Sequence, residues 1–81
     1  MPKVRRSNLP RPLFRHLAGR AAQREISTAQ LEELFEWLET EPEVPEHRWF
    51  KRFRQFTVCG EGEWIKTFLR PGQAALGEEL N

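Results

Sequence analysis

The sequence contains only one cysteine, Cys59, among its 81 residues. A single thiol excludes an internal disulfide, which predicts a reducing, cytoplasmic setting. No apolar run approaches the roughly 20 residues that a membrane-spanning helix needs. The basic N-terminus also leads into no apolar segment of the kind found in secretory signals. We therefore expect a chain that neither crosses a membrane nor carries an export signal.

Recognisable sites for metals, cofactors and phosphates are also absent. His16 and His47 have no partners at metal-ligand spacing. The glycines at positions 60 and 62 surround a glutamate and are not followed by a lysine-bearing helix, so they predict a turn and not a phosphate loop. Nothing near Cys59 in the sequence would activate its thiol. The sequence thus predicts no metal, no cofactor and no catalytic cysteine.

The short chain predicts one small domain. We expect a basic extended arm at residues 1–12, which contain three prolines, a single α+β domain at residues 13–70, and a loose tail at residues 71–81. Domains of this size bury little apolar surface, so stability is expected to be marginal. Dimerisation or a bound partner would then add to it.

Charge is segregated along the chain although the net charge is only +1. Residues 1–24 contain seven basic residues and no acid, and residues 25–46 contain eight glutamates and no lysine or arginine. Residues 47–70 are basic again. Either the first two elements lie antiparallel and neutralise each other, or the basic faces are kept for a polyanion.

Two helices are predicted in the first half of the chain. The first runs from Pro12 to about residue 25, and its expected buried stripe consists of Leu13, Phe14, Leu17, Ala18 and Ala21. The second opens at Ser27, where the spacing to Gln30 indicates a reciprocal capping box, and it ends before Pro42. Its apolar stripe comprises Leu31, Leu34, Phe35 and Leu38, and Trp37 lies at the margin of that stripe as a lid over the core.

A β-hairpin is predicted in the second half. Residues 46–53 have aromatic residues at helical spacing, which favours a short helical turn before the hairpin. Residues 53–59 and 63–70 then form two antiparallel strands, joined by a turn at residues 61–62. In this register Val58 lies opposite Ile65, and Phe56, Val58, Ile65 and Leu69 share the buried face. The predicted fold is α+β, an antiparallel helix pair packed on a two-stranded, or three-stranded, antiparallel sheet.

The other face of the hairpin would carry Trp64 and Phe68 beside Lys66 and Arg70. Aromatic rings interleaved with cations are typical of sheets that bind single-stranded RNA. The alternatives are internal burial of this face, or a contact with a protein partner or a second copy in a homodimer. We therefore predict a non-enzymatic binding module with these RNA-contacting residues: Arg48, Lys51, Arg52, Arg54, Trp64, Lys66, Phe68 and Arg70.

Two further functional hypotheses arise from the residues. The acidic helix, through Glu32, Glu36 and Glu39, would suit a basic protein partner in an adaptor or antitoxin-like role. Metal-free RNA cleavage would need an acid, a base and cations, and residues of those types are His47, Lys51, Arg52, Arg54, Glu63 and Lys66. Two helices followed by a basic hairpin resemble, in element order and size, the RelE/ParE toxins of bacterial toxin-antitoxin pairs, which implies a ribonuclease. Those toxins usually begin with a strand, and no catalytic residue transfers from them to this chain.

Overall fold

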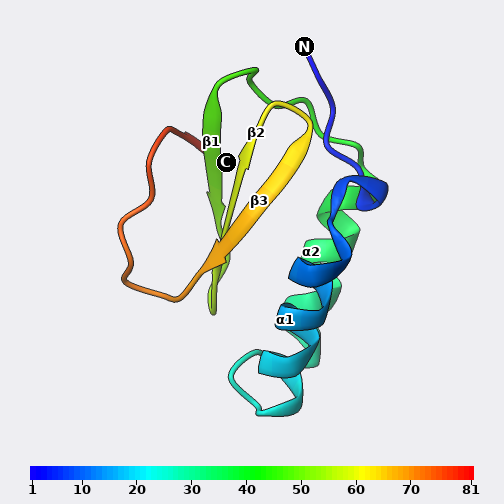
Figure 1. The fold of residues 1–81 in the computed structure, drawn as a ribbon, viewed down its shortest axis with the longest axis vertical. Coiled ribbons are helices and arrows are strands. Elements are labelled where there is room, and N and C mark those ends of the chain that lie inside the picture. The colour runs from blue at the N-terminus through cyan, green and yellow to red at the C-terminus, as the bar shows by residue number, and fades with distance from the viewer.

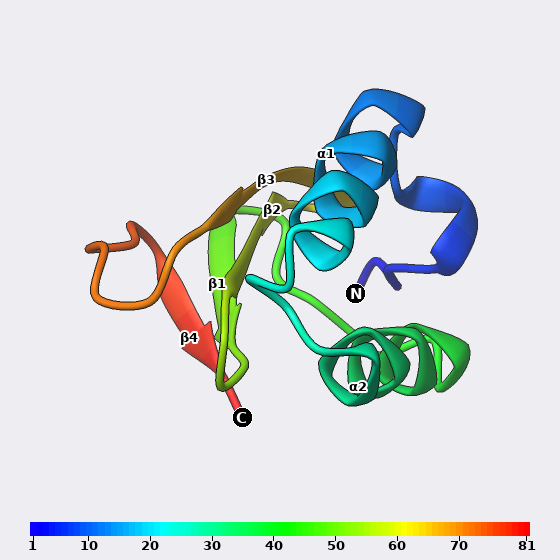
Figure 2. The ribbon, with the colours of Figure 1, turned by 90° about the horizontal axis from the view of Figure 1, so that it is seen from below.

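The computed structural model describes all residues 1–81 as an α+β fold with one helical layer and one sheet. A short 3₁₀ turn, η1 (Arg6–Asn8), precedes helices α1 (Arg11–Ala22) and α2 (Thr28–Glu39). Strands β1 (Arg48–Arg52), β2 (Thr57–Glu61), β3 (Trp64–Leu69) and β4 (Glu78–Leu80) follow. The α+β class and the antiparallel helix pair are confirmed, and both helices lie on the same face of the sheet (Figures 1 and 2).

The sheet is larger and more mixed than the predicted hairpin. Its strand order is β3-β2-β1-β4; β1, β2 and β3 pair antiparallel, and β4 pairs parallel to β1. The predicted helical turn at residues 46–53 is wrong, because this stretch contains β1. Trp49 and Phe50 are both buried although they are adjacent, one on each face of this central strand. Burial on both faces produces the closely spaced aromatics that imitate a helical pattern.

The last residues form a strand where a loose tail was predicted. β4 joins β1 through the register Trp49↔Glu78 and Lys51↔Leu80. Gly77 precedes it with a φ of 110°, and a Cβ at this position would lie 2.3 Å from the carbonyl oxygen of Arg48. Only glycine tolerates this close approach of the two strands. The connecting residues 70–77 cross the side of the sheet opposite the helices (Figures 1 and 2).

The hairpin register differs from the predicted one in two ways. The turn residues are Gly62 and Glu63, since Glu61 pairs with Trp64. A bulge between Cys59 and Gly60 then leaves Lys66 as an extra residue in β3, so that Val58 lies opposite Phe68. Ile65 and Phe68 therefore both face the helices. The predicted exposure of Phe68 is wrong, because only 6% of its surface is accessible, and Leu69 lies on the other face instead.

The helices largely match their predicted boundaries. The hydroxyl of Ser27 accepts a hydrogen bond from the backbone N–H of Gln30, which confirms this half of the capping box. The reciprocal half is absent: the N–H of Ser27 donates to the side chain of Gln55, and the Gln30 side chain accepts from the N–H of Gln55. The helix start is thus tied to the β1–β2 turn.

The core lies between the helices and the sheet, and it includes residues from the N-terminal arm. Val4 is fully buried, and its N–H donates to the Pro42 carbonyl oxygen, so residues 1–12 contact the connector after α2. On α1, Leu17 is buried as expected, but Phe14 remains 44% exposed. The buried apolar cluster comprises Val4, Leu17, Ile26, Leu34, Leu38, Val44, Trp49, Phe56, Val58, Ile65 and Phe68.

Candidate nucleic-acid interface

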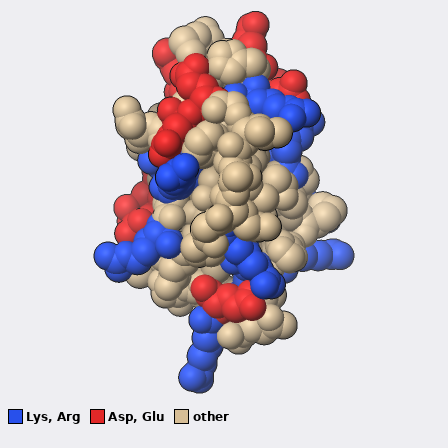
Figure 3. Space-filling view, turned by 90° about the vertical axis from the view of Figure 1, so that its left-hand side faces the viewer, with Lys and Arg blue, Asp and Glu red and all other residues tan.

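The sheet face opposite the helices, hereafter the open face, carries the candidate site. Residues paired across strands share a face, so the register places these side chains on it: Arg48, Phe50, Arg52, Thr57, Cys59, Glu61, Trp64, Thr67, Leu69 and Glu79. Figure 3 views the molecule from this side and shows an uncharged strip through the middle, with lysines, arginines and glutamates around it. No helix covers this face (Figure 2).

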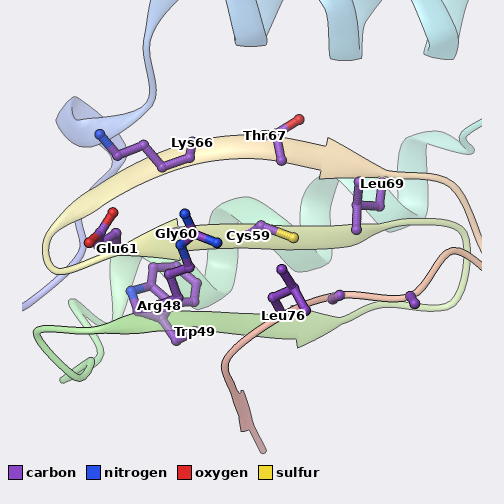
Figure 4. A pocket seen from close by; sticks show the side chains of 11 residues that line it. Arg48, Trp49, Cys59, Gly60, Glu61, Lys66, Thr67, Leu69 and Leu76 are labelled. Atoms are coloured by element: carbon purple, nitrogen blue, oxygen red, sulfur yellow. The ribbon is translucent and has the colours of Figure 1, made fainter.

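A groove of about 380 Å³ crosses the open face. Its floor contains Cys59 and Gly60 of β2, and one wall is formed by Ala74, Ala75 and Leu76 of the 70–77 segment. Arg48, Glu61 and Lys66 lie at one end of the groove, while Leu69 and Leu76 lie at the other (Figure 4). The groove therefore combines an apolar end with a charged end, which suits a ligand that has a ring and an anionic group.

Trp64 is the most exposed aromatic ring of the sheet, with 50% of its surface accessible. It lies in the same cross-strand row as Glu61 and Arg48. Neither Arg48 nor Lys66 forms a salt bridge. The sequence predicted Trp64 and Phe68 beside Lys66 and Arg70; in the structure Trp64 is exposed, Phe68 is buried, and Glu61 lies between Trp64 and Arg48 in the sheet register.

The other predicted contact residues are placed differently. Lys51 lies on the helix side of the sheet, with its ammonium 5.7 Å from the ring centroid of Trp37. Arg52 lies on the open face but is 3.7 Å from a carboxylate oxygen of Glu79. Phe68 belongs to the core and is unavailable to a ligand.

Arg54 and Arg70 lie at the opposite end of the hairpin from Trp64. They line a second hollow of about 330 Å³ together with Arg20 and Glu25. A carboxylate oxygen of Glu25 is 3.3 Å from Nε of Arg20, and its other oxygen is 3.8 Å from a guanidinium nitrogen of Arg70. Three arginines and one carboxylate line this hollow, so this end of the hairpin keeps an excess of positive charge.

Residues proposed for RNA cleavage do not converge on one site. Lys51 and Lys66 are on opposite faces of the sheet, since Lys51 stacks towards α2 and Lys66 lines the open-face groove. Nε2 of His47 is 3.1 Å from a carboxylate oxygen of Glu78 at the strand edge. This geometry does not assemble an acid, a base and a phosphate-binding cation around one point.

Burial raises the pKa of the Cys59 thiol above its ordinary value. A raised pKa leaves a smaller thiolate fraction at neutral pH, and the thiolate is the reactive form. We expect alkylation of Cys59 by iodoacetamide to rise at a higher pH in the folded protein than in the same chain unfolded in urea. A folded-state pH profile equal to the unfolded one would contradict the raised pKa, and one at lower pH would show that the thiol is activated.

Two parts of the candidate interface were not predicted from the sequence. Glu61 was treated as a turn residue, although it projects into the charged end of the groove, and the 70–77 segment was treated as part of a tail, although it forms the groove wall. A Pro-Gly pair at positions 71–72 indicated the turn that begins this segment. No local pattern indicated that the segment returns across the sheet.

Comparison with known proteins found no matching family model, no similar curated protein and no similar solved structure. None of the helices is long and apolar enough to cross a membrane.

Proposed function

We propose that this protein is a non-enzymatic binding module that holds single-stranded RNA on the open face. The observation on which the proposal rests is the half-exposed ring of Trp64 on the same sheet face as the groove lined by Arg48 and Lys66, two cations that form no salt bridge. A sheet face that met only water would be expected to carry polar side chains, so a large ring on it favours a ligand with stacking surfaces. Bases stack on such rings, and the neighbouring cations contact the phosphates.

The distribution of charge supports an RNA strand that runs along the hairpin formed by β2 and β3. Arg48 and Lys66 lie near its turn, and Arg54 and Arg70 lie at its other end. Between them the groove floor at Gly60 has no side chain above the backbone, and Leu69 and Leu76 offer apolar contacts to a base. Four phosphate contacts would give a slope of roughly −3 in a plot of log affinity against log salt concentration.

Replacing Trp64 with alanine is expected to weaken RNA binding about 5- to 150-fold, which corresponds to the roughly 1–3 kcal/mol lost per stacked base. The ring is half-exposed, so the variant should remain folded. Binding is measured by fluorescence anisotropy with a labelled mixed-sequence RNA at low and near-physiological salt, and circular dichroism checks the fold. The same RNA is examined on a gel for cleavage.

A matched control is Phe14→Ala, which removes another large exposed ring, but from the helical layer. It should leave RNA affinity unchanged. For charge, Lys66→Ala should reduce the salt slope by about 0.7, whereas Arg11→Ala on α1 should not. This function would be excluded if Trp64→Ala and Phe14→Ala weakened RNA binding equally, or if Lys66→Ala and Arg11→Ala changed the salt slope equally. It would also be excluded if the parent protein bound no RNA at low salt. Slower alkylation of Cys59 in the presence of RNA would place the RNA in the groove.

The alternative function is recognition of a basic protein by α2. Glu32, Glu36 and Glu39 are all exposed, and of the three only Glu39 forms a salt bridge, with 4.0 Å between its carboxylate and the guanidinium of Arg6. Double charge reversal at Glu32 and Glu36 would abolish such binding and leave RNA binding intact. The two functions use opposite layers of the molecule, so one set of variants separates them.

A further inference from the structure

The outer edge of β3 is the longest unpaired strand edge in the molecule. β3 has six residues and lies at the end of the sheet, with β2 on one side only. Outside the helices and strands, no backbone hydrogen bond involves residues 64–69. The outward N–H and C=O groups of β3 therefore have no partner in the chain, and such an edge is a template for another strand.

The opposite edge of the sheet is better protected than the β3 edge. β4 has only three residues, and two of them are the glutamates Glu78 and Glu79. Short length and charge are the usual means by which proteins prevent pairing at a sheet edge. β3 is twice as long, contains no proline and carries a single charge, on Lys66. Its protective features are that lysine and the bulge at the same residue.

The bulge makes β3 complementary to an inverted copy of itself. Along the strand, Trp64 and Leu69 lie on the open face, Ile65 and Phe68 face the core, and the central residues Lys66 and Thr67 lie at the open-face groove. From residue 64 to residue 69 the side chains therefore lie on the open, core, open, open, core and open face, and this order is the same from either end of the strand. A strand with ordinary two-residue alternation and an even number of residues would lack this symmetry.

We propose that β3 pairs antiparallel with β3 of a second copy, about a two-fold axis between Lys66 and Thr67. In this register Trp64 lies opposite Leu69 of the second copy, Ile65 opposite its Phe68, and Lys66 opposite its Thr67. Every pair then joins side chains of one face. A slip of the register by one or two residues in either direction places a core-facing side chain opposite an open-face one.

Dimerisation through this edge produces one continuous sheet from two copies. It satisfies the outward backbone groups of both β3 strands, and it covers part of the exposed surface of Trp64 and Leu69. The two open faces become neighbours on one side of the joined sheet. This inference rests on the strand edge and its register, so it stands whether or not the open face binds RNA.

The central pair supplies a test with two opposite outcomes. Thr67 is exposed. In the proposed dimer each Thr67 lies opposite Lys66 of the other copy, so the dimer contains two such pairs. Thr67→Lys places like charges opposite each other, whereas Thr67→Glu places opposite charges there. Directly opposed charges change pairing by about 0.2–1 kcal/mol per pair. With two pairs, Thr67→Lys should raise the dimer dissociation constant by about 2- to 30-fold, and Thr67→Glu should lower it by a similar factor.

Sedimentation equilibrium of the full chain over a wide concentration range measures the dissociation constant, and circular dichroism confirms that each variant is folded. The double variant Lys66→Glu with Thr67→Lys exchanges the two sides of the pair and should restore the affinity lost in Thr67→Lys. A parent protein that stays monomeric up to millimolar concentration would overturn the proposal. A dimer whose affinity is the same in Thr67→Lys and Thr67→Glu would also overturn it, because its contact would lie elsewhere.

Discussion

Replacing Trp49 with alanine should remove about 3–5 kcal/mol from the free energy of unfolding. Trp49 is completely buried in the central strand, its ring meets that of Trp37 edge-on at 6.0 Å, and its indole N–H donates to the Gly62 carbonyl oxygen at 2.8 Å. The variant loses the ring contacts, leaves a cavity and leaves that carbonyl without its partner. A chain of this length has a total stability of only about 4–12 kcal/mol. The loss is therefore a large fraction of the total stability and should lower the urea midpoint strongly.

Urea unfolding followed by circular dichroism measures this loss, and two comparisons interpret it. Trp49→Phe keeps a ring in the core but removes the N–H donor, so its cost should be lower, at about 1–3 kcal/mol. Trp64→Ala removes a tryptophan that is half-exposed and should cost much less than Trp49→Ala. Equal losses at positions 49 and 64 would contradict the assignment of Trp49 to the core and Trp64 to the open face.

Replacing Gly60 with alanine should lower the free energy of unfolding by about 1–3 kcal/mol or more. A Cβ at this position would lie 2.3 Å from one carbon of the Trp49 ring and 2.6 Å from another. This ring is buried on all sides and held by its hydrogen bond to Gly62, so it has little room to move. The methyl group must displace either the ring or β2, and either shift disturbs the core.

Gly19 on α1 provides the matched control for Gly60, because a Cβ there meets nothing within 4 Å. Gly19→Ala should raise the free energy of unfolding by about 0.5–1 kcal/mol, since alanine favours the helix. The same chemical change is thus expected to have opposite signs at the two positions. Urea unfolding of both variants tests this directly, and a loss of similar size at both positions would show that contact with the Trp49 ring is not the cause.

Local patterns predicted the helical layer well. The capping residue Ser27 and the apolar spacing of Leu34 and Leu38 determine where α2 begins and which of its faces is buried, and all of this information lies within a dozen residues. These features depend on nearest neighbours, which a single sequence displays. The exposure of Trp64, in contrast, was one of three possibilities that the sequence left open for its face, beside internal burial and contact with another chain.

The sheet was harder to predict because its register and its fourth strand depend on distant residues. Phe50 is buried on the face away from the helices, where a guanidinium from Arg52 lies 5.6 Å from its ring centroid and β4 pairs alongside. The bulge that turns Phe68 into the core occurs next to Gly60, which is the residue that the Trp49 ring covers. Neither effect is visible in the local alternation of β3. One extra residue in a strand is enough to exchange the buried positions.

The pairing of β4 with β1 has a consequence for the order in which the molecule folds. During synthesis the helices and the β1–β2–β3 meander leave the ribosome first, and their contacts are mostly local, so they can form early. β1 keeps an unpaired edge until Glu78–Leu80 emerges and Gly77 permits the close approach to Arg48. Until then the nascent chain exposes both edges of its sheet, on β1 and on β3. The stage before β4 pairs with β1 is therefore one at which the chain is especially prone to aggregate.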